Sequence, residues 1–347
     1  MSGTVWLNTQ LGQWNRYADN NREYGAQKWI NYAFSLETPV SAALPRLGVA
    51  LNTRFLDGLW YHKLGLNWNV SNNSTLSFWG QTFHRNAGFT DYLLSPDIWS
   101  SDQLNRNNSL NLSFTHRYKY TRGLGFFTVS ARAPLFSDNF NYNYAQMELV
   151  NTHVLHRLLL RTRVFARYGA GKNVPAESAL YLAGASPEEM MDNKYLRSAG
   201  FVPSAWTGYS PYETNHLQYG GGMNLRGYAG YYAFDEREGK TLVGYRGRGG
   251  VALNAEVDFT NYFRWQPAFT RNWLSARMYA FADAGMIELN TTNGITALTP
   301  AERASDLRVD AGLGVAFTIK KWWVFDKAKL LTLRFDMPVF LNRPPYG

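Results

Sequence analysis

The sequence predicts an all-β protein, a transmembrane antiparallel β-barrel, and three observations lead to that class. Apolar and polar residues alternate with period two through most of the chain, as in strands with one apolar and one polar face. Aromatic residues make up 16% of the 347 residues although the mean hydropathy is -0.35, which is typical of a wall ringed by aromatic girdles. No run of about 18 apolar residues occurs, so no transmembrane helix is expected.

The alternation divides the chain into about thirteen predicted strands. Each is near the roughly ten residues that cross a bilayer at a tilt. Nine precede one long connection and four follow it. The first nine segments are 5–11, 30–37, 47–52, 64–70, 76–79, 110–115, 127–132, 145–149 and 158–168, and the last four are 251–259, 274–285, 307–315 and 331–337.

The connections between these segments favour a membrane barrel over a soluble sandwich. Short turns, such as 71–73 and 121–123, alternate with longer connections, such as 15–26, 85–106 and 286–306. Outer-membrane barrels have short periplasmic turns and long extracellular loops. A polar strand face would be solvated in a sandwich as well, but a sandwich has no reason to keep all its long loops at one end.

One connection, 169–246, is much longer than the rest. Structureless loops of more than about 15 residues are uncommon in compact domains unless they have a function. We expect this loop to fold into the lumen of a single barrel domain that spans 1–347. Glycines flank Arg226 and let the chain bend sharply there. The arginine either caps a surface hairpin or meets a wall carboxylate, for which Asp283 and Glu256 are the candidates.

The strand count predicts that the chain is part of a larger barrel. Bacterial single-chain barrels have an even number of strands, whereas the alternation gives thirteen. The segment 340–347 contains two prolines, which cannot donate to a ladder, and is expected to be a loop. We therefore expect at least one closing strand after Gly347, and one or two strands before Thr4.

Charge and cysteine content restrict the surroundings of the protein. There is no cysteine, which excludes disulfide scaffolds and thiolate metal sites and is compatible with an oxidising compartment. The first residues show neither a basic region nor an apolar core, so no targeting signal is expected in this chain. The net charge of +9 fits plain solubility, or a basic surface or lumen that faces phosphate head groups or acidic client proteins.

No motif for catalysis, cofactor binding or metal binding stands out, so we expect no enzyme, cofactor or metal. The six histidines lack ligand spacing, and neither a G-x-S-x-G elbow nor a Walker loop is present. Glu256 and Asp258 face inward together and could resemble a glycosidase pair, but pairing with inner-wall arginines is the simpler interpretation. The aromatic residues follow strand parity as girdles do, which disfavours nucleic acid as a partner.

Two motifs carry a resemblance to a known superfamily. Leu225-Arg226-Gly227-Tyr228, followed two strands later by Phe281-Ala282-Asp283-Ala284-Gly285, resembles the outer-membrane barrels that include BamA, TamA and FhaC. The resemblance implies a barrel of about sixteen strands, of which this chain covers the third to the fifteenth. It implies that Arg226 contacts Asp283 on the inner wall, with Glu256 as a second partner. The other motif residues complete the tip (Leu225, Gly227, Tyr228) and the wall (Phe281, Gly285).

The resemblance implies a function in the insertion or translocation of proteins at the outer membrane of a Gram-negative bacterium. The partners would be the lipid bilayer, client outer-membrane or exported proteins, and other subunits of an outer-membrane complex. No POTRA-like repeats precede the barrel in this chain, unlike in BamA and FhaC. The segment 181–195 resembles a branch in which the barrel follows a gluzincin-type aminopeptidase, so a membrane anchor for an enzymatic domain outside this segment is one alternative. A passive pore is the other.

Overall fold

The long elements of the computed structural model are all strands, and thirteen of them form one sheet. The structure describes residues 4–13, 28–39, 46–56, 59–85, 106–135, 140–186, 188–189, 221–229, 233–237, 240–263, 270, 272–289, 303–320 and 331–344. The sheet strands are β1 (Thr4–Gln13), β2 (Lys28–Pro39), β3 (Arg46–Leu56), β4 (Leu59–Asn69), β5 (Ser74–Arg85), β6 (Arg106–Tyr120), β7 (Gly123–Pro134), β8 (Asn141–Leu155), β9 (Leu158–Lys172), β14 (Gly250–Asp258), β15 (Leu274–Ile287), β16 (Arg308–Ile319) and β17 (Leu331–Leu341).

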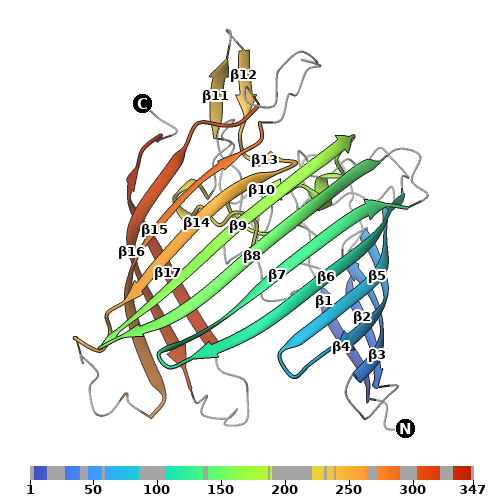
Figure 1. Ribbon diagram of the computed structural model, residues 1–347, viewed down its shortest axis with the longest axis horizontal. Coiled ribbons are helices and arrows are strands. Elements are labelled where there is room, and N and C mark those ends of the chain that lie inside the picture. Colours follow the sequence, from blue (N-terminus) through green and yellow to red (C-terminus); the bar gives the residue numbers. More distant parts are fainter. Residues whose placement is uncertain are drawn as a thin grey trace.

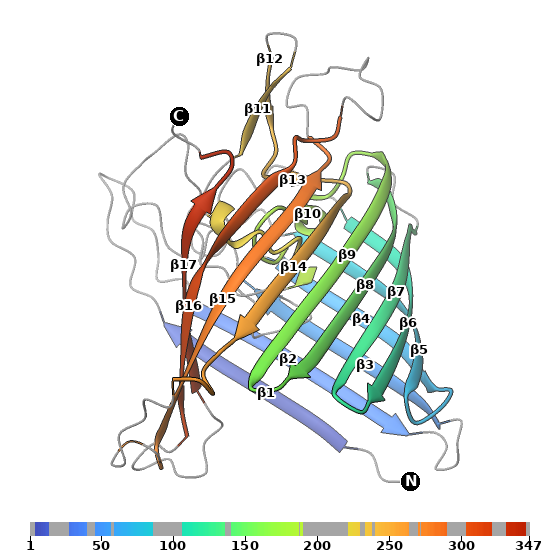
Figure 2. The same ribbon diagram turned by 60° about the vertical axis from the view of Figure 1, so that its left-hand side comes forward.

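The predicted fold class is confirmed, because each of the thirteen predicted segments corresponds to one strand of this sheet. Neighbours in sequence are neighbours in the sheet, and β14 follows β9 across the long connection. All the pairings are antiparallel. The sheet curls into an open barrel (Figures 1 and 2) in which β1 and β17 are the edge strands. Of the helices in the described ranges, none combines the length and the apolarity needed to span a membrane.

The two faces of the sheet differ sharply, as the period of two requires. On β14, Leu253 is 52% exposed while its neighbour in the next inward position, Asn254, is 5% exposed. The same alternation on the other strands gives an apolar outer face. Its exposed large side chains include Leu64, Leu66, Trp68, Phe78, Leu112, Val129, Met147, Leu149, Val164, Val251, Leu313, Leu333, Phe335, Met337 and Val339.

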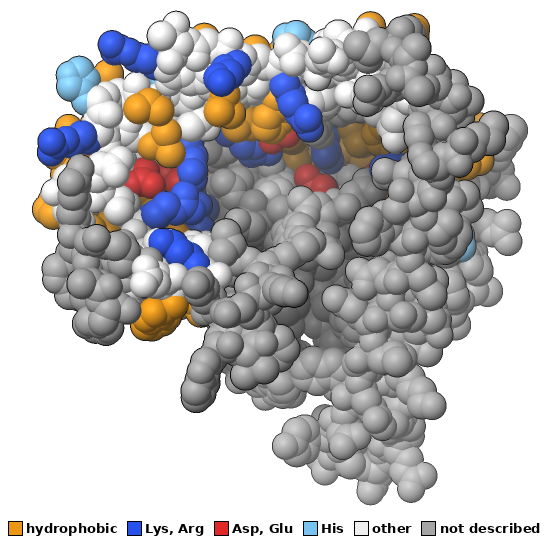
Figure 3. All heavy atoms as spheres, turned by 90° about the horizontal axis from the view of Figure 1, so that it is seen from below, with side chains coloured by type: hydrophobic (Ala, Val, Ile, Leu, Met, Phe, Trp, Pro, Cys, Tyr) orange, Lys and Arg blue, Asp and Glu red, His pale blue; other side chains and the backbone are white. Residues whose placement is uncertain are grey.

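The inner face is charged, and several of its arginines are paired with carboxylates. Arg163 Nε lies 2.5 Å from Glu148 Oε1, and Arg161 Nη1 lies 3.2 Å from Glu256 Oε1. Seen from below, Lys and Arg side chains line the left and upper sides of the hollow, and a few acidic side chains lie among them (Figure 3). The expected pairing of Glu256 with inner-wall arginines is therefore present.

The described residues of the connection between β9 and β14 form short elements, and part of them lies against the inner face (Figure 2). The segment 180–182 lies between two other parts of the connection. On one side Tyr181 pairs with Arg246, and on the other the backbone N–H of Met223 donates to the Tyr181 carbonyl at 2.9 Å. We call residues 177–186, 188–189, 221–228 and 244–247 the plug. The short elements are η1 (Ala176–Ser178), β10 (Leu180–Tyr181), η2 (Arg226–Tyr228), β11 (Phe234–Arg237), β12 (Lys240–Val243) and β13 (Arg246–Gly247).

An apolar cluster seats the plug on the wall. Leu182, Met223 and Leu225 are fully buried, and they pack with Phe165 of β9 and Ile287 of β15. Burial of such side chains contributes about 1.5–3 kcal/mol each. The plug is thus packed like a protein core.

Candidate functional site

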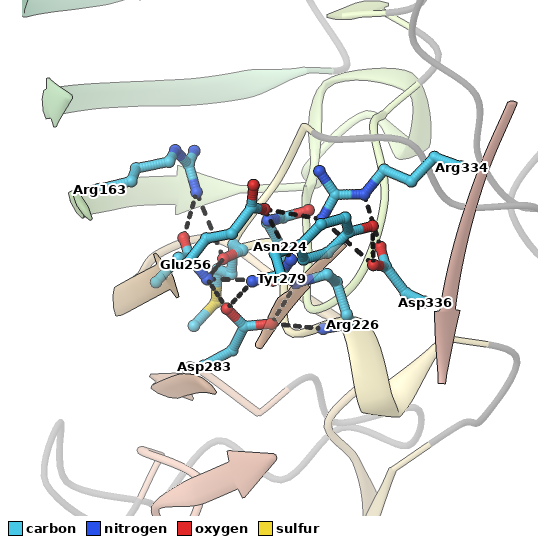
Figure 4. A network of polar contacts seen from close by, with 10 residues as sticks. Arg163, Asn224, Arg226, Glu256, Tyr279, Asp283, Arg334 and Asp336 are labelled. Carbon is cyan, nitrogen blue, oxygen red and sulfur yellow. Dashed lines mark hydrogen bonds and ion pairs between the residues drawn. The ribbon is translucent and has the colours of Figure 1, made fainter. Parts of the chain in front are cut away.

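Arg226 opens the 3-10 helix η2, and its guanidinium meets Asp283 of β15 in a two-pronged contact (Figure 4). Nε lies 2.7 Å from Oδ2, and Nη2 lies 2.9 Å from Oδ1. The backbone N–H of Arg226 also donates to Oδ2, at 3.2 Å. Side-chain exposure is 7% for Arg226 and 0% for Asp283, so water is excluded from the pair. The structure thus brings together the two residues that the motifs singled out.

The other two predicted wall residues shape the surface under the tip. The ring centroid of Phe281 lies 4.0 Å from Arg226 Cζ, which is a cation–π contact. A Cβ at Gly285 would lie 3.0 Å from Leu225 Cδ1 and 2.9 Å from Met223 Cε, so glycine leaves room for the tip. Positions 281, 283 and 285 share one face of the strand. The F-x-D-x-G spacing therefore places the Phe281 ring, the Asp283 carboxylate and the space left by Gly285 in one row on this face.

Gly227 and Tyr228 fix the tip to the next two strands. A Cβ at Gly227 would lie only 2.7 Å from the Cβ of Asp310 on β16, so a larger residue would lift the tip from the wall. The Tyr228 hydroxyl donates to Asn342 Oδ1 at 2.7 Å. The same oxygen accepts from the backbone N–H of Val309, also at 2.7 Å. The tip therefore contacts β15, β16 and the end of β17.

Glu256 of β14, the second predicted partner, is shared by three arginines. Its Oε2 lies 3.3 Å from Arg226 Nη1 and 2.8 Å from Arg334 Nη2. Its Oε1 lies 3.2 Å from Arg161 Nη1. Arg334 is held in addition by Asp336, with 2.9 Å between Nε and Oδ2. One carboxylate on the inner wall thus joins the tip to β9 and β17. We call Arg226, Asp283 and Glu256 the Arg226 anchor.

Two residues that neither sequence motif contains hold the backbone leading to the tip. The side-chain amide of Asn254 donates to the Asn224 carbonyl at 3.0 Å and to Asp283 Oδ1 at 3.1 Å. Arg163 Nη2 donates to the Gly222 carbonyl at 2.8 Å. Both side chains lie at inward positions of regular strands, opposite each other in the β9–β14 ladder. Their inward positions can be recognised from the period-two alternation of the sequence, but many other polar residues also lie at inward positions.

The arrangement can hold and release a chain segment. Burial works against the charge of Arg226, but the hydrogen bonds and the charge of Asp283 outweigh it and raise the pKa of Arg226 above its ordinary value. The guanidinium therefore stays charged, and removing either partner of such a buried pair costs about 3–5 kcal/mol. Among the described residues, no group of three His, Asp or Glu side chains is arranged to hold a metal ion.

Comparison with known proteins finds similar solved structures. No family model and no curated protein sequence matches the chain. One similar structure is the crystal structure of BamA from Haemophilus ducreyi lacking POTRA domains 1-3, with a TM-score of 0.49, 16% identity, and coverage of 97% of this chain and 61% of that one. Another is CdiB from Acinetobacter baumannii, with a TM-score of 0.30, 11% identity, and coverage of 95% and 66%.

This chain therefore spans less than two thirds of the length of either solved structure. At these TM-scores and identities, neither likeness carries an inference about activity, and the fold rests on the strand pairings themselves.

Proposed function

We propose that the chain forms most of the wall of an integral outer-membrane β-barrel of the BamA-like superfamily, in a Gram-negative bacterium, and acts in the insertion or translocation of proteins. The observation that carries the proposal is the combination of an apolar outer face with a loop held inside by a buried Arg226–Asp283 pair. The motif residues that carry the resemblance are the same ones that make this contact.

The mechanism follows from what holds the plug. All of its polar contacts with the wall are hydrogen bonds and ion pairs, which can be broken and remade without covalent chemistry. A closed plug would keep the lumen sealed, and a displaced plug would leave a polar passage lined by arginines and carboxylates. The partners would be the lipid bilayer on the outer face, a client polypeptide, and other subunits of an outer-membrane complex.

Placement in the bilayer predicts that a charge on the outer face is costly in proportion to its depth. We expect Leu253→Lys, near the middle of β14 and opposite Val164 of β9, to destabilise the membrane-embedded barrel by about 2–4 kcal/mol. Leu155→Lys is the matched control, because Leu155 is also exposed but lies at the turn between β8 and β9. It should cost about 0–1 kcal/mol. Urea titration in lipid vesicles measures both; equal costs would contradict the placement.

The function itself is tested by removing the plug. Gly250 already lies opposite Arg167, so about eight Gly and Ser residues can join Lys172 to Gly250 in place of 173–249. In planar bilayers the parent protein should conduct poorly. The deletion variant should show large, steady currents, and an extended polypeptide added to the bath should interrupt them. Steady conductance of the parent, equal to that of the deletion variant, would contradict the proposal and favour a passive pore.

A further inference from the structure

The plug contacts a second part of the wall, far from the Arg226 anchor in sequence and in the sheet. Glu188 Oε2 lies 2.6 Å from Arg132 Nη1 of β7, and Glu188 Oε1 accepts a hydrogen bond from the Gln81 side chain of β5. Side-chain exposure is 1% for Arg132 and 13% for Glu188. We call these three residues the Glu188 anchor. The Arg226 anchor, in contrast, lies on β14 and β15.

A second carboxylate of the plug strengthens this contact through the wall. Asn107 of β6 accepts from Arg132 Nη2 at 2.7 Å, and its own amide donates to Glu177 Oε1 at 2.9 Å. Glu177 is completely buried. The polarity is the reverse of that at the Arg226 anchor: here the plug supplies carboxylates and the wall supplies the arginine.

The two anchors are joined by a stiff path through the plug. The Glu189 carboxylate accepts from the backbone N–H of Gly222, at 3.1 and 3.2 Å to its two oxygens, next to the segment that leads to Arg226. The backbone N–H of Leu225 donates to the Leu182 carbonyl at 3.1 Å. Gly221 and Gly222 have φ of +79° and +54°, and a Cβ on Gly221 would lie 2.5 Å from that of Ala185. The two halves of the plug are therefore packed backbone to backbone.

We propose that the Glu188 anchor and the Arg226 anchor hold the plug as one rigid body, so that neither end of the plug leaves the wall without the other. The lumen then opens only when both anchors release. The part about opening rests on the proposed function, whereas the coupling of the two anchors stands by itself.

The electrostatics of Glu188 support a contact that persists at neutral pH. Burial acts to raise the pKa of Glu188, but the Arg132 charge and hydrogen bonds from Ser178, Gln81 and Arg132 outweigh it and hold this pKa below its usual value. A carboxyl group whose pKa is lowered by folding contributes stability that is lost only as the pH falls through the lowered value. The Glu188 carboxylate therefore stays ionised opposite Arg132 at neutral pH.

The absence of cysteine from the sequence allows a direct test with single reporters. Ala183→Cys places a thiol near the Glu188 anchor, and Leu225→Cys places one beside Arg226; both positions are buried. Each reporter is combined with Glu188→Gln, with Asp283→Asn and with both changes, in the full chain embedded in lipid vesicles. The measurement is the rate of reaction with a maleimide, which follows the population in which the plug has left the wall. Heat-modifiable mobility checks that each variant is folded.

A rigid plug predicts a response at the remote reporter. Glu188→Gln should speed labelling of Leu225→Cys by about tenfold or more, by the same factor as labelling of Ala183→Cys. Asp283→Asn should speed labelling of both reporters by one common factor. In the variant with both changes, the labelling rate should rise by the product of the two factors. Glu288→Gln is the matched control: it breaks the Arg248–Glu288 pair, which belongs to neither anchor, and should change neither rate.

If Glu188→Gln changes labelling only at Ala183→Cys, or at neither position, the proposal is wrong. If that variant does not fold, Arg132→Gln removes the same contact from the wall side and must give the same remote response. The result is independent of whether the barrel conducts or passes polypeptides, since only the position of the plug is measured. Failure of the coupling is therefore distinguishable from failure of the proposed function.

Discussion

Replacing Arg226 by Glu should raise the fraction of molecules in which the plug has left the wall, while the barrel stays folded. The change removes the two-pronged pair with Asp283 and places a new carboxylate against Asp283 and Glu256. The lost contact alone is worth about 3–5 kcal/mol, because a buried partner is left uncompensated. Repulsion adds to this, but the loop can relieve it by moving into water. The expected result is a protease-sensitive loop in a barrel with normal heat-modifiable mobility.

The reversed pair tests whether the contact itself is responsible. Asp283→Arg alone should behave like Arg226→Glu, since it faces Arg226 with a second cation and removes the acceptor of its backbone N–H. In the double variant a guanidinium again meets a carboxylate, with Glu256 nearby as a further acceptor. We expect most of the protease resistance to return, although the bond from the Arg226 backbone is not restored.

The half-buried pair Arg248–Glu288 at the rim of the barrel serves as the control for this cycle. Its side chains are 26% and 21% exposed, so water reaches both, and reversing their charges should cost much less than reversing the buried Arg226–Asp283 pair. If the two Arg226 and Asp283 single variants and the double variant all resist protease like the parent, then the pair does not hold the loop. The superfamily resemblance would lose the contact on which it depends.

The strands were predictable because the wall has two different environments. A side chain on β14 points either outward, as Leu253 does, or toward the plug, as Glu256 does, and this alternation is written directly into the sequence. The long connection carries no such signal. In its described part the paired segments are two to four residues long, β10 with β13 and β11 with β12, and no periodicity can be recognised over that length.

The site was predictable only where a motif marked it. Arg226 and Asp283 are 57 residues apart, and the spacing of two short glycine-containing motifs was enough to pair them. Glu188 and Arg132 are also far apart, at 56 residues, but no motif surrounds either of them. Their contact depends on how the plug lies across β5 to β7. That position is set by burial of Leu182, Met223 and Leu225, which sequence alone does not place in space.

Glu256 should prove as important as Arg226, because one carboxylate serves three guanidinium groups. We expect Glu256→Gln to destabilise the membrane-embedded barrel by about 3–5 kcal/mol, since Arg161, Arg226 and Arg334 would then face one another without the shared negative charge. Arg334 keeps Asp336 and Arg226 keeps Asp283, so Arg161 loses the larger share of its ionic contact, and Arg226 is left between two arginines with one carboxylate fewer. The expected signs are a lower urea midpoint and a loop that is cut by protease.

Asp258→Asn is the matched control, because it makes the same acid-to-amide change two residues away on the same face of β14. Asp258 is also buried, but its contact is with the backbone N–H of Thr260 at 3.0 Å, which an asparagine oxygen can still accept. Its cost should stay within about 1 kcal/mol, the usual worth of one hydrogen bond. If the two variants lose stability equally, the shared charge of Glu256 is not what joins the plug to the wall. If only Glu256→Gln exposes the loop, burial alone cannot explain the loss, because Asp258 is buried to the same degree.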